Sequence, residues 1–136
     1  MAIDLLVNID VDNLDKAIAF YTDAFDRRVG RRFGDAGVEL LGASSPIYLL
    51  VKSASSAASI TTLQPRNYQR HWTPVHLDFV VEDVHAAVRK ATLAGATLEG
   101  DIHTCKWGRI AHLADPFGHG ICLVEFLGRG YDEIAS

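Results

Sequence analysis

The pattern of apolar and polar residues near the start of the chain predicts a strand followed by an amphipathic helix. In residues 5–11, Val7, Ile9 and Val11 share one face, and the opposite face carries Leu6, Asn8 and Asp10, which is typical of a strand with one buried and one mixed face. Apolar residues then recur at helical spacing between residues 14 and 25. The preceding pair Asp12-Asn13 is a typical N-cap, so we predict a helix that ends before Gly30.

Three short apolar runs follow and predict a meander of strands. Glycine and serine separate these runs, which cover Arg31–Phe33, Val38–Leu41 and Ile47–Lys52. The next segment, residues 53–73, is rich in Ser, Ala and Thr and then in Gln, Arg and Asn. Because so long a loop is uncommon inside a compact domain, we expect it to connect two units and to act as a lid or a partner contact.

The second half of the chain repeats the order of elements found in the first. Residues 75–81 alternate again, with His76, Asp78 and Val80 on one face, and Glu82-Asp83 forms a second N-cap before a helix that ends near Gly95. Three short strands are then predicted at Ala96–Glu99, Arg109–Ala114 and Gly120–Phe126, with His103–Lys106 as an optional further strand. A shift of 70 residues places Asn13 on Asp83 and Leu6 on His76. The repeat is therefore strand, helix and three strands, written twice.

The repeat predicts an α+β fold in which a helix covers one face of each curled sheet and the other face is concave. The apolar faces of the two first strands suit the helices. By elimination, the residues that face the hollow are Leu6, Asn8, Asp10, His76, Asp78 and Val80. The last two strands are joined by Asp115-Pro116-Phe117-Gly118, whose residue types predict a tight turn.

Composition and charge exclude several classes of protein. The 136 residues are 49% hydrophobic and 22% charged, as expected of one globular domain. A net charge of −4 without a basic stripe argues against a nucleic-acid partner. The two cysteines, Cys105 and Cys122, are too few for a disulfide framework. No apolar run approaches the ~20 residues of a membrane span, and an acid stands where a signal peptide is basic. We therefore expect a cytoplasmic protein with no membrane partner.

Two motifs within the repeat carry a family resemblance. The first is Val11-Asp12-Asn13-Leu14-Asp15-Lys16-Ala17 with Ala19-Phe20-Tyr21, and the second is Gly108-Arg109-Ile110-Ala111 leading to Asp115-Pro116-Phe117-Gly118. At this spacing the chain resembles the glyoxalase/bleomycin resistance protein/extradiol dioxygenase superfamily from Ile3 to Leu127. The resemblance implies the vicinal oxygen chelate fold, with βαβββ modules at 3–52 and 74–127, a connector at 53–73 and a tail at 128–136. It also implies a homodimer that acts on a small molecule.

The resemblance also implies where a metal would bind. In the metal-dependent members, the first and last strands of each module each provide one ligand, and the matching positions are Leu6, Leu49, His76 and Cys122. Leucine donates no lone pair, and a divalent cation needs three or four protein ligands. We therefore expect no metal cofactor of the usual kind. His112 or Asp78 could complement His76 and Cys122 if the phases of the strands differ from those predicted here.

Other polar residues of the hollow are candidates for ligand binding. Two residues apart on one strand, His76 and Asp78 lie ~6 to 7 Å apart on one face and could serve one ligand as a base and an orienting acid, with Asp10 as an alternative acid. The acids and Asn8 must otherwise meet water or a basic side chain such as Arg109.

The cysteine and the aromatic residues each have two interpretations. Cys122 fits a small apolar filler better than a reactive thiolate. Trp72, Trp107 and Tyr68 could clamp a cationic ligand, but we favour a role in fastening loops. His112 remains a candidate on either face.

Three functional hypotheses remain open. The first, which we favour, is a ligand-binding protein of this superfamily that works without the usual metal. The second is an enzyme that acts on a small oxygenated or thiol-conjugated molecule through His76 with Asp78 or Asp10. The third is a lyase, isomerase or dioxygenase with an atypical set of metal ligands. Fold kinship alone does not choose among them, since one fold hosts several chemistries.

Overall fold

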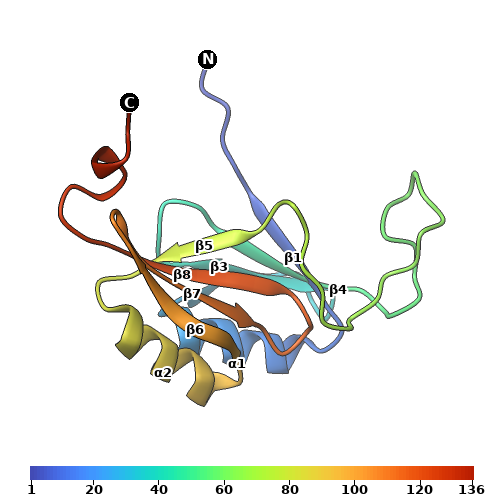
Figure 1. The fold of residues 1–136 in the computed structure, drawn as a ribbon. Coiled ribbons are helices and arrows are strands. Elements are labelled where there is room, and N and C mark those ends of the chain that lie inside the picture. Colours follow the sequence, from blue (N-terminus) through green and yellow to red (C-terminus); the bar gives the residue numbers. More distant parts are fainter. The chain divides into compact units, whose positions relative to one another are not determined.

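The first of two compact units in the chain is a four-stranded sheet with one helix. The computed structural model describes all 136 residues and divides them into unit 1, Met1–Gln69, and unit 2, Arg70–Ser136. Unit 1 contains β1 (Val7–Val11), α1 (Leu14–Phe25), β2 (Arg28–Arg32), β3 (Gly37–Leu41) and β4 (Ile47–Val51) (Figure 1). The strand order is β1-β4-β3-β2, with β1 parallel to β4 and the other pairs antiparallel.

Unit 2 repeats this arrangement and adds a C-terminal turn of 3₁₀-helix. It contains β5 (Leu77–Val80), α2 (Val84–Ala94), β6 (Thr97–Cys105), β7 (Gly108–Ala114), β8 (Gly120–Phe126) and the 3₁₀-helix η1 (Gly130–Glu133). The order β5-β8-β7-β6 is that of unit 1, with the edge pair β5 and β8 parallel. The predicted α+β repeat is therefore confirmed.

One pair of predicted strands is a single strand in the structure. The segments predicted at 96–99 and 103–106 both belong to β6, which pairs with β7 along its length. The pairing is irregular between Glu99 and His103, where Gly100 has a φ of 73°. A left-handed residue of this kind bends a strand without ending it.

Both helices begin at the predicted caps. The side-chain Oδ1 of Asn13 accepts a hydrogen bond from the Lys16 amide at 3.1 Å, and that of Asp83 accepts one from the Ala86 amide at 3.1 Å. These bonds satisfy amides that have no partner within the helix. Helix α2 ends at Gly95, which has a positive φ. Neither α1 nor α2 is long and apolar enough to cross a membrane.

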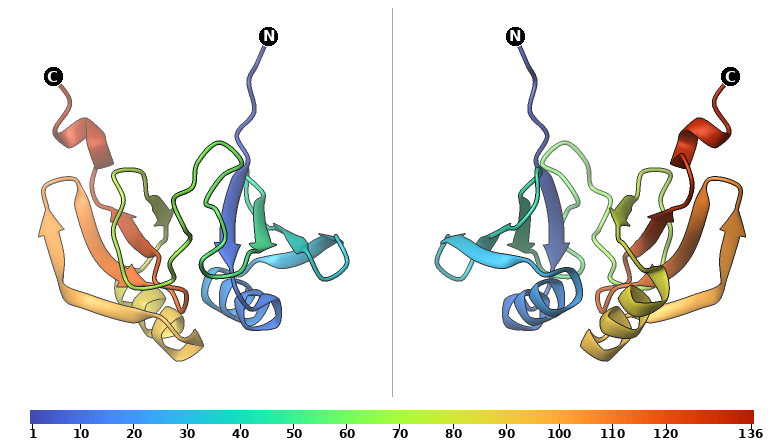
Figure 2. Two further views of the ribbon diagram at one scale, coloured as in Figure 1. Left: turned by 90° about the vertical axis from the view of Figure 1, so that its right-hand side faces the viewer. Right: turned by 90° about the vertical axis from the view of Figure 1, so that its left-hand side faces the viewer.

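Each helix packs on one face of its own sheet (Figure 2). The core of unit 1 consists of buried residues of α1 and the strands, among them Phe20, Tyr21, Val11, Val38, Leu40 and Leu49. The core of unit 2 likewise consists of buried residues of α2 and its strands, among them Val84, Val88, Ala91, Leu113, Ile121 and Leu123. The face opposite each helix carries polar residues such as Asn8 of β1 and Asp78 of β5. The odd and even phases predicted for β1 and β5 are those observed.

The position assigned to Leu49 is wrong by one residue. Leu49 pairs with Ile9 and is 0% exposed, so it belongs to the helix-facing side of β4. The residue that pairs with Asn8 on the opposite side is Tyr48. The sequence of β4, Ile-Tyr-Leu-Leu-Val, is apolar at nearly every position and gives no alternation from which to read its phase.

The predicted turn at Asp115 sets the register of β8. The carboxylate oxygen Oδ1 of Asp115 accepts hydrogen bonds from the amides of Phe117 at 2.8 Å and His119 at 2.9 Å, and Gly118 has a φ of 85°. An aspartate that caps its own turn in this way holds one conformation of the loop. As a result β7 and β8 pair with His112 directly opposite Cys122.

Candidate functional site

A row of four chemically active side chains crosses the sheet of unit 2. Asp78 on β5 pairs with Cys122 on β8, which pairs with His112 on β7, which in turn pairs with Glu99 on β6. Side chains of directly paired residues project to the same face of a sheet. We call Asp78, Cys122, His112 and Glu99 the polar row. It lies on the face opposite the core of this unit, and it resolves the face of His112, which the sequence left open.

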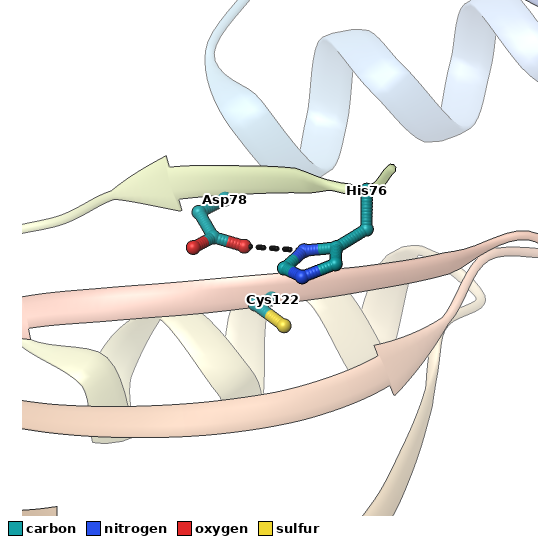
Figure 3. Close-up of side chains that lie close together, drawn as sticks. All are labelled: His76, Asp78 and Cys122. Carbon is teal, nitrogen blue, oxygen red and sulfur yellow. Dashed lines mark hydrogen bonds and ion pairs between the residues drawn. The ribbon is translucent and has the colours of Figure 1, made fainter. Parts of the chain in front are cut away.

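His76 lies just before β5 and is joined to the polar row by a hydrogen bond. Its Nδ1 is 2.8 Å from Oδ1 of Asp78 (Figure 3). A carboxylate accepts from Nδ1–H, which leaves the lone pair on Nε2, and Nε2 hydrogen-bonds no other group of the protein. The side chains of His76 and Asp78 are 40% and 35% exposed. The predicted pair is therefore in direct contact, on side chains that are partly exposed.

Cys122 lies under this pair and is shielded from solvent. It is 1% exposed, and its sulfur lies close to the imidazole of His76 (Figure 3). Burial, together with the charge of Asp78 and a hydrogen bond to it, raises the pKa of the Cys122 thiol to about 12. The thiol is thus protonated at neutral pH. Because the thiolate is the nucleophilic form, this geometry does not make a cysteine–histidine nucleophile.

Three donor atoms converge at this point. A nitrogen of His76, a carboxylate oxygen of Asp78 and the sulfur of Cys122 all lie within 4.8 Å of one another. Asp78 was one of the alternative partners considered for His76 and Cys122, and it is the one that completes the group. The other alternative, His112, lies beside Cys122 on β7, where its ring packs against Trp72 and His103 with centroids 5.8 Å and 6.3 Å away.

Trp72 is fastened across one end of the polar row. Its indole N–H donates to Oε1 of Glu99 at 3.0 Å, and the guanidinium of Arg70 lies 4.6 Å from the centroid of its ring. Arg70 also forms a bidentate ion pair with Glu99 at 2.5 Å, which lowers the pKa of the Glu99 carboxyl. The rings of His76 and His112 lie nearly perpendicular to the indole, with centroids 6.0 Å and 5.8 Å away. This arrangement agrees with the fastening role that we favoured for Trp72.

Gly120 provides the space for that indole. A Cβ atom at this position would lie 2.4 Å from the Trp72 ring, closer than any van der Waals contact. Sequence reasoning did not identify Gly120, Arg70 or Glu99 as part of the site. The charges of Arg70 and Glu99 offered one signal, but the two residues are 29 positions apart and meet only because the connector follows a particular path.

The acid predicted on the hollow side of unit 1, Asp10, is engaged within that unit. Oδ2 of Asp10 accepts from Nε of Arg66 at 2.8 Å, and the same guanidinium donates to Oγ of Ser56 at 3.0 Å. Asn8 is exposed on the same strand. An arginine does pair with Asp10, as expected, but it comes from the connector and fastens that loop to β1.

Arg109 does not have the predicted role. Its guanidinium pairs with Oε2 of Glu125 at 2.7 Å, and the other oxygen of Glu125 accepts from the amide of Val84 at 3.0 Å. The Arg109–Glu125 pair therefore completes the start of α2. Glu125 itself is buried, so this carboxylate takes the arginine that we had expected to meet Asp10, Asp78 or Asn8.

The remaining aromatic candidates hold loops in place. Trp107 packs with Phe126 and Tyr131, with ring centroids 6.2 Å and 5.1 Å away, so the tail around η1 folds onto the end of its own sheet. The hydroxyl of Tyr68 donates to the backbone carbonyl of Lys52 at 2.7 Å. In both cases the contacts agree with a fastening role.

The equivalent row in unit 1 is a closed ion-pair network. Asn8 pairs with Tyr48, which pairs with Glu39. The Tyr48 hydroxyl donates to Oε2 of Glu39 at 3.0 Å, and Arg31 donates to Oε1 and Oε2 at 3.1 Å and 2.7 Å. Hydrogen bonds from the side chain and the backbone of Arg31 lower the pKa of the Glu39 carboxyl to about 2.

Comparison with known families and proteins identifies relatives over most of the chain. The family described as Glyoxalase-like domain matches residues 6–124. An uncharacterized protein of Mycobacterium bovis is 34% identical over 115 residues, which cover 80% of this chain and 74% of that protein. Two uncharacterized Mycobacterium tuberculosis proteins have the same identity, and the match covers 66% of their length, so this chain spans just under two thirds of them.

Solved structures share the fold at low sequence identity. A mutant of the fosfomycin resistance protein FosX from Listeria monocytogenes, complexed with Mn(II) and dihydroxypropylphosphonic acid, has a TM-score of 0.74 at 18% identity and covers 99% of this chain and 100% of its own. A glyoxalase/bleomycin resistance protein/dioxygenase family enzyme from Burkholderia phytofirmans has a TM-score of 0.69 at 22% identity, with 90% and 97% covered. At these identities the likeness establishes the fold alone.

Proposed function

Since this chain belongs to the glyoxalase-like domain family, within the glyoxalase/bleomycin resistance/dioxygenase superfamily, we propose that it binds a small organic molecule at the polar row. The anchor is the imidazole of His76. The observation that carries the proposal is the 2.8 Å bond from Nδ1 to Asp78, which orients the ring and leaves Nε2 without a protein partner on a partly exposed side chain. A rigidly held acceptor of this kind is the usual polar feature of a ligand site.

The Mn(II) of the FosX complex does not fit the residues of this chain. A hard cation prefers oxygen and imidazole ligands and gains little from a thiol. Of the positions implied by the resemblance, Leu6 donates nothing and the fourth ligand is replaced by Cys122. In unit 1, Tyr48 at the row position is bonded to Glu39. We therefore propose that binding of the organic molecule does not require a hard divalent cation.

The charges of the polar row indicate the chemistry of the ligand. Asp78 is hydrogen-bonded to an imidazole and lies beside the thiol of Cys122, and no guanidinium pairs with it. The nearby cation, Arg70, already forms an ion pair with Glu99. An anionic ligand would find no unpaired positive charge in this row, whereas a neutral or cationic molecule that donates a hydrogen bond to Nε2 suits it. An aromatic ring with an amine or hydroxyl group has this chemistry.

A second candidate function is acid–base catalysis at the same nitrogen. A carboxylate bonded to Nδ1 holds the imidazole in the tautomer in which Nε2 takes a proton from a substrate. The hydrogen bond between His76 and Asp78 has this form. Binding and catalysis share the anchor, and they differ in whether the molecule is released unchanged.

The test is a screen of neutral and cationic aromatic compounds by ligand-observed NMR and thermal shift, in buffer that contains a chelator. We expect hits that bind the wild type and His85→Ala but not His76→Ala. His85 is an exposed histidine on α2 and serves as the matched control. Equal binding to His76→Ala, or binding that requires added Mn²⁺, would overturn the proposal.

The fate of the compound separates the two candidates. Recovery of the bound compound unchanged supports a binding protein. A product that forms with the wild type and not with Asp78→Asn supports catalysis, because that substitution leaves the imidazole in place and removes the carboxylate that orients it.

A further inference from the structure

We propose that the apolar and aromatic side chains beyond the polar row form a second subsite, which binds a ring at the far end of the same ligand. The inference rests on the proposed function, because it gives the ligand a polar head at His76 and an apolar body along the sheet of unit 2. The ligand is thus an elongated molecule with an amine or hydroxyl group at one end and a ring at the other. All the residues concerned belong to unit 2.

The face that carries the polar row becomes apolar towards the C-terminal end of β8. Side chains two residues apart on a strand share a face, so Val80 follows His76 and Asp78 on this face. Val80 pairs with Val124, and Val124 pairs with Ile110. We call Val80, Val124 and Ile110 the apolar row. It lies directly beside the polar row, and Val80 is 64% exposed.

Three aromatic rings lie beyond the apolar row. Phe126 is the next residue of β8 on this face after Val124. The centroid of its ring lies 4.8 Å from that of Tyr131 and 6.2 Å from that of Trp107, and the Trp107 and Tyr131 centroids are 5.1 Å apart. We call Trp107, Phe126 and Tyr131 the aromatic end. Phe126 and Tyr131 are 40% and 52% exposed, so the packing among the rings leaves part of both accessible.

The tail holds the aromatic end on this side of the sheet. The amide of Leu127 donates to the carbonyl of Trp107 at 3.0 Å, and the amide of Gly130 donates to that of Leu127 at 2.8 Å. Gly130 has a φ of 60°, and a Cβ atom there would lie 3.3 Å from the Phe126 ring. The 3₁₀-helix η1 therefore begins against Phe126, on the side of the sheet away from α2 (Figure 1, Figure 2). Rings held in place before binding lower its entropic cost.

The length and the polarity of this face define the class of ligand. Cys122 and Phe126 are four residues apart on β8, which is about 13 Å at the rise of a strand. A polar head followed by two linked rings spans a distance of this order. The apolar row carries no charged side chain, so a ring laid on it covers hydrocarbon and gains the free energy of apolar burial.

A pair of compounds that differ by one ring tests the second subsite. Benzylamine carries the polar head with a single ring, and 4-phenylbenzylamine adds a second ring. We expect the wild type to bind 4-phenylbenzylamine about 10- to 100-fold more tightly than benzylamine, as burial of one ring provides. Isothermal titration calorimetry measures both Kd values, and their ratio is the readout. Nuclear Overhauser effects should connect the outer ring to the ring protons of Tyr131 and Phe126.

Variants of the second subsite should lower the ratio of the two Kd values. Tyr131→Ala removes one ring of the aromatic end and should lower it by about 3- to 10-fold. Val80→Thr keeps the shape of the side chain but places a hydroxyl under the ligand, and should lower it by about fivefold or more. Both residues are more than half exposed, so neither change threatens the fold.

The matched control is Leu93→Ala, which changes an exposed apolar residue on α2 and should leave the ratio unchanged. Equal ratios in the wild type, Tyr131→Ala and Val80→Thr would overturn the inference. So would bound 4-phenylbenzylamine whose outer ring shows no contact with Tyr131 or Phe126.

The outcomes also separate this inference from the proposed function. Binding of both compounds that is lost in His76→Ala, with a ratio that Tyr131→Ala leaves unchanged, would retain the proposed function and reject the second subsite. Binding of 4-phenylbenzylamine that depends on Tyr131 and survives in His76→Ala would retain the second subsite and reject His76 as the anchor. If neither compound binds, the second subsite is rejected, and the wider screen decides the proposed function.

Discussion

The same row of sheet positions is a closed network in unit 1 and an open site in unit 2. In unit 1 the carboxylate of Glu39 accepts from Arg31 and Tyr48 on both oxygens. In unit 2 the carboxylate of Asp78 holds an imidazole whose second nitrogen is unpaired. Both units have the same strand order. The difference shows that the fold places equivalent positions side by side in both sheets. The side chains at those positions determine whether they stabilise the sheet or remain available to bind a ligand.

The two rows differ in how their charges are balanced. Glu39 is neutralised by a guanidinium, which holds its carboxylate ionised. In unit 2, Arg70 forms its ion pair with Glu99 at the far end of the row. The neighbours of Asp78 are the imidazole of His76 and the thiol of Cys122, which can both exchange protons. Ion pairs with arginine are geometrically complete and leave few acceptor sites. In each row, the end that carries the arginine ion pair, Arg31–Glu39 or Arg70–Glu99, therefore has a structural role.

The largest effect is expected from removing the open nitrogen. His76→Ala should weaken binding of the screened aromatic compounds by about 10- to 150-fold, the value of one hydrogen bond to a charged or polarised group. Tyr48→Phe, which changes the closed row of unit 1, should leave this affinity within about twofold. Isothermal titration calorimetry on both variants measures the contrast. An equal loss in the two variants would mean that the rows do not differ in the way proposed.

A smaller effect is expected from disturbing the fastened end of the open row. Gly120→Ala places a methyl group where the Trp72 ring lies and should destabilise the protein by about 1 to 3 kcal/mol, as overpacking does. Chemical denaturation measures the loss. In a Trp72→Ala background the same substitution should cost little, because the clashing ring is gone. A cost that is unchanged without the indole would show that the contact is not the cause.

The closed row predicts a dependence of unit 1 on acid. The pKa of Glu39 is lowered from 4.5 to about 2, so its contribution to stability is present above pH 4.5 and is lost as the pH falls toward 2. The protection of the β3 and β4 amides, which is the exchange rate relative to the intrinsic rate at the same pH, should therefore fall over this window. In Glu39→Gln the protection should be lower at neutral pH and nearly independent of pH between 4.5 and 2. A wild-type profile that is flat over the same window would contradict the ion pair.

The smallest effect is expected from a single hydroxyl of the closed row. Tyr48→Phe removes one donor to Glu39 and should cost about 0.5 to 1.5 kcal/mol of stability. The Arg31–Glu39 pair remains and keeps the carboxylate satisfied. Thermal and chemical unfolding measure the change. A loss well above this range would show that the hydroxyl positions the arginine as well.

The sequence was sufficient for the local structure and for the anchor of the site. Alternation at residues 75–81 placed His76 and Asp78 on one face, and the caps at Asn13 and Asp83 located both helices. These features depend on neighbours in sequence, whose periodicity can be read directly.

Contacts between residues that are distant in the sequence could not be predicted from local periodicity. The phase of β4 is hidden by its continuous apolar run, so Leu49 was placed where Tyr48 lies. Arg70 meets Glu99 only through the path of the connector. The partner of Arg109 was wrong because several carboxylates lay within reach of any arginine, and the buried Glu125 was the one that needed a charge most.

The hydrogen-bonded turn at Asp115 has a consequence for how this site can evolve. Because side chains alternate along β8, one residue inserted between His119 and Cys122 would exchange the two faces of the strand and send the thiol into the core. Changes in length are thus incompatible with the site at this place, whereas substitutions at position 122 leave the frame intact. New ligand preferences in such a sheet arise by substitution of side chains at positions whose register is fixed. The turn at Asp115 fixes that register for β8.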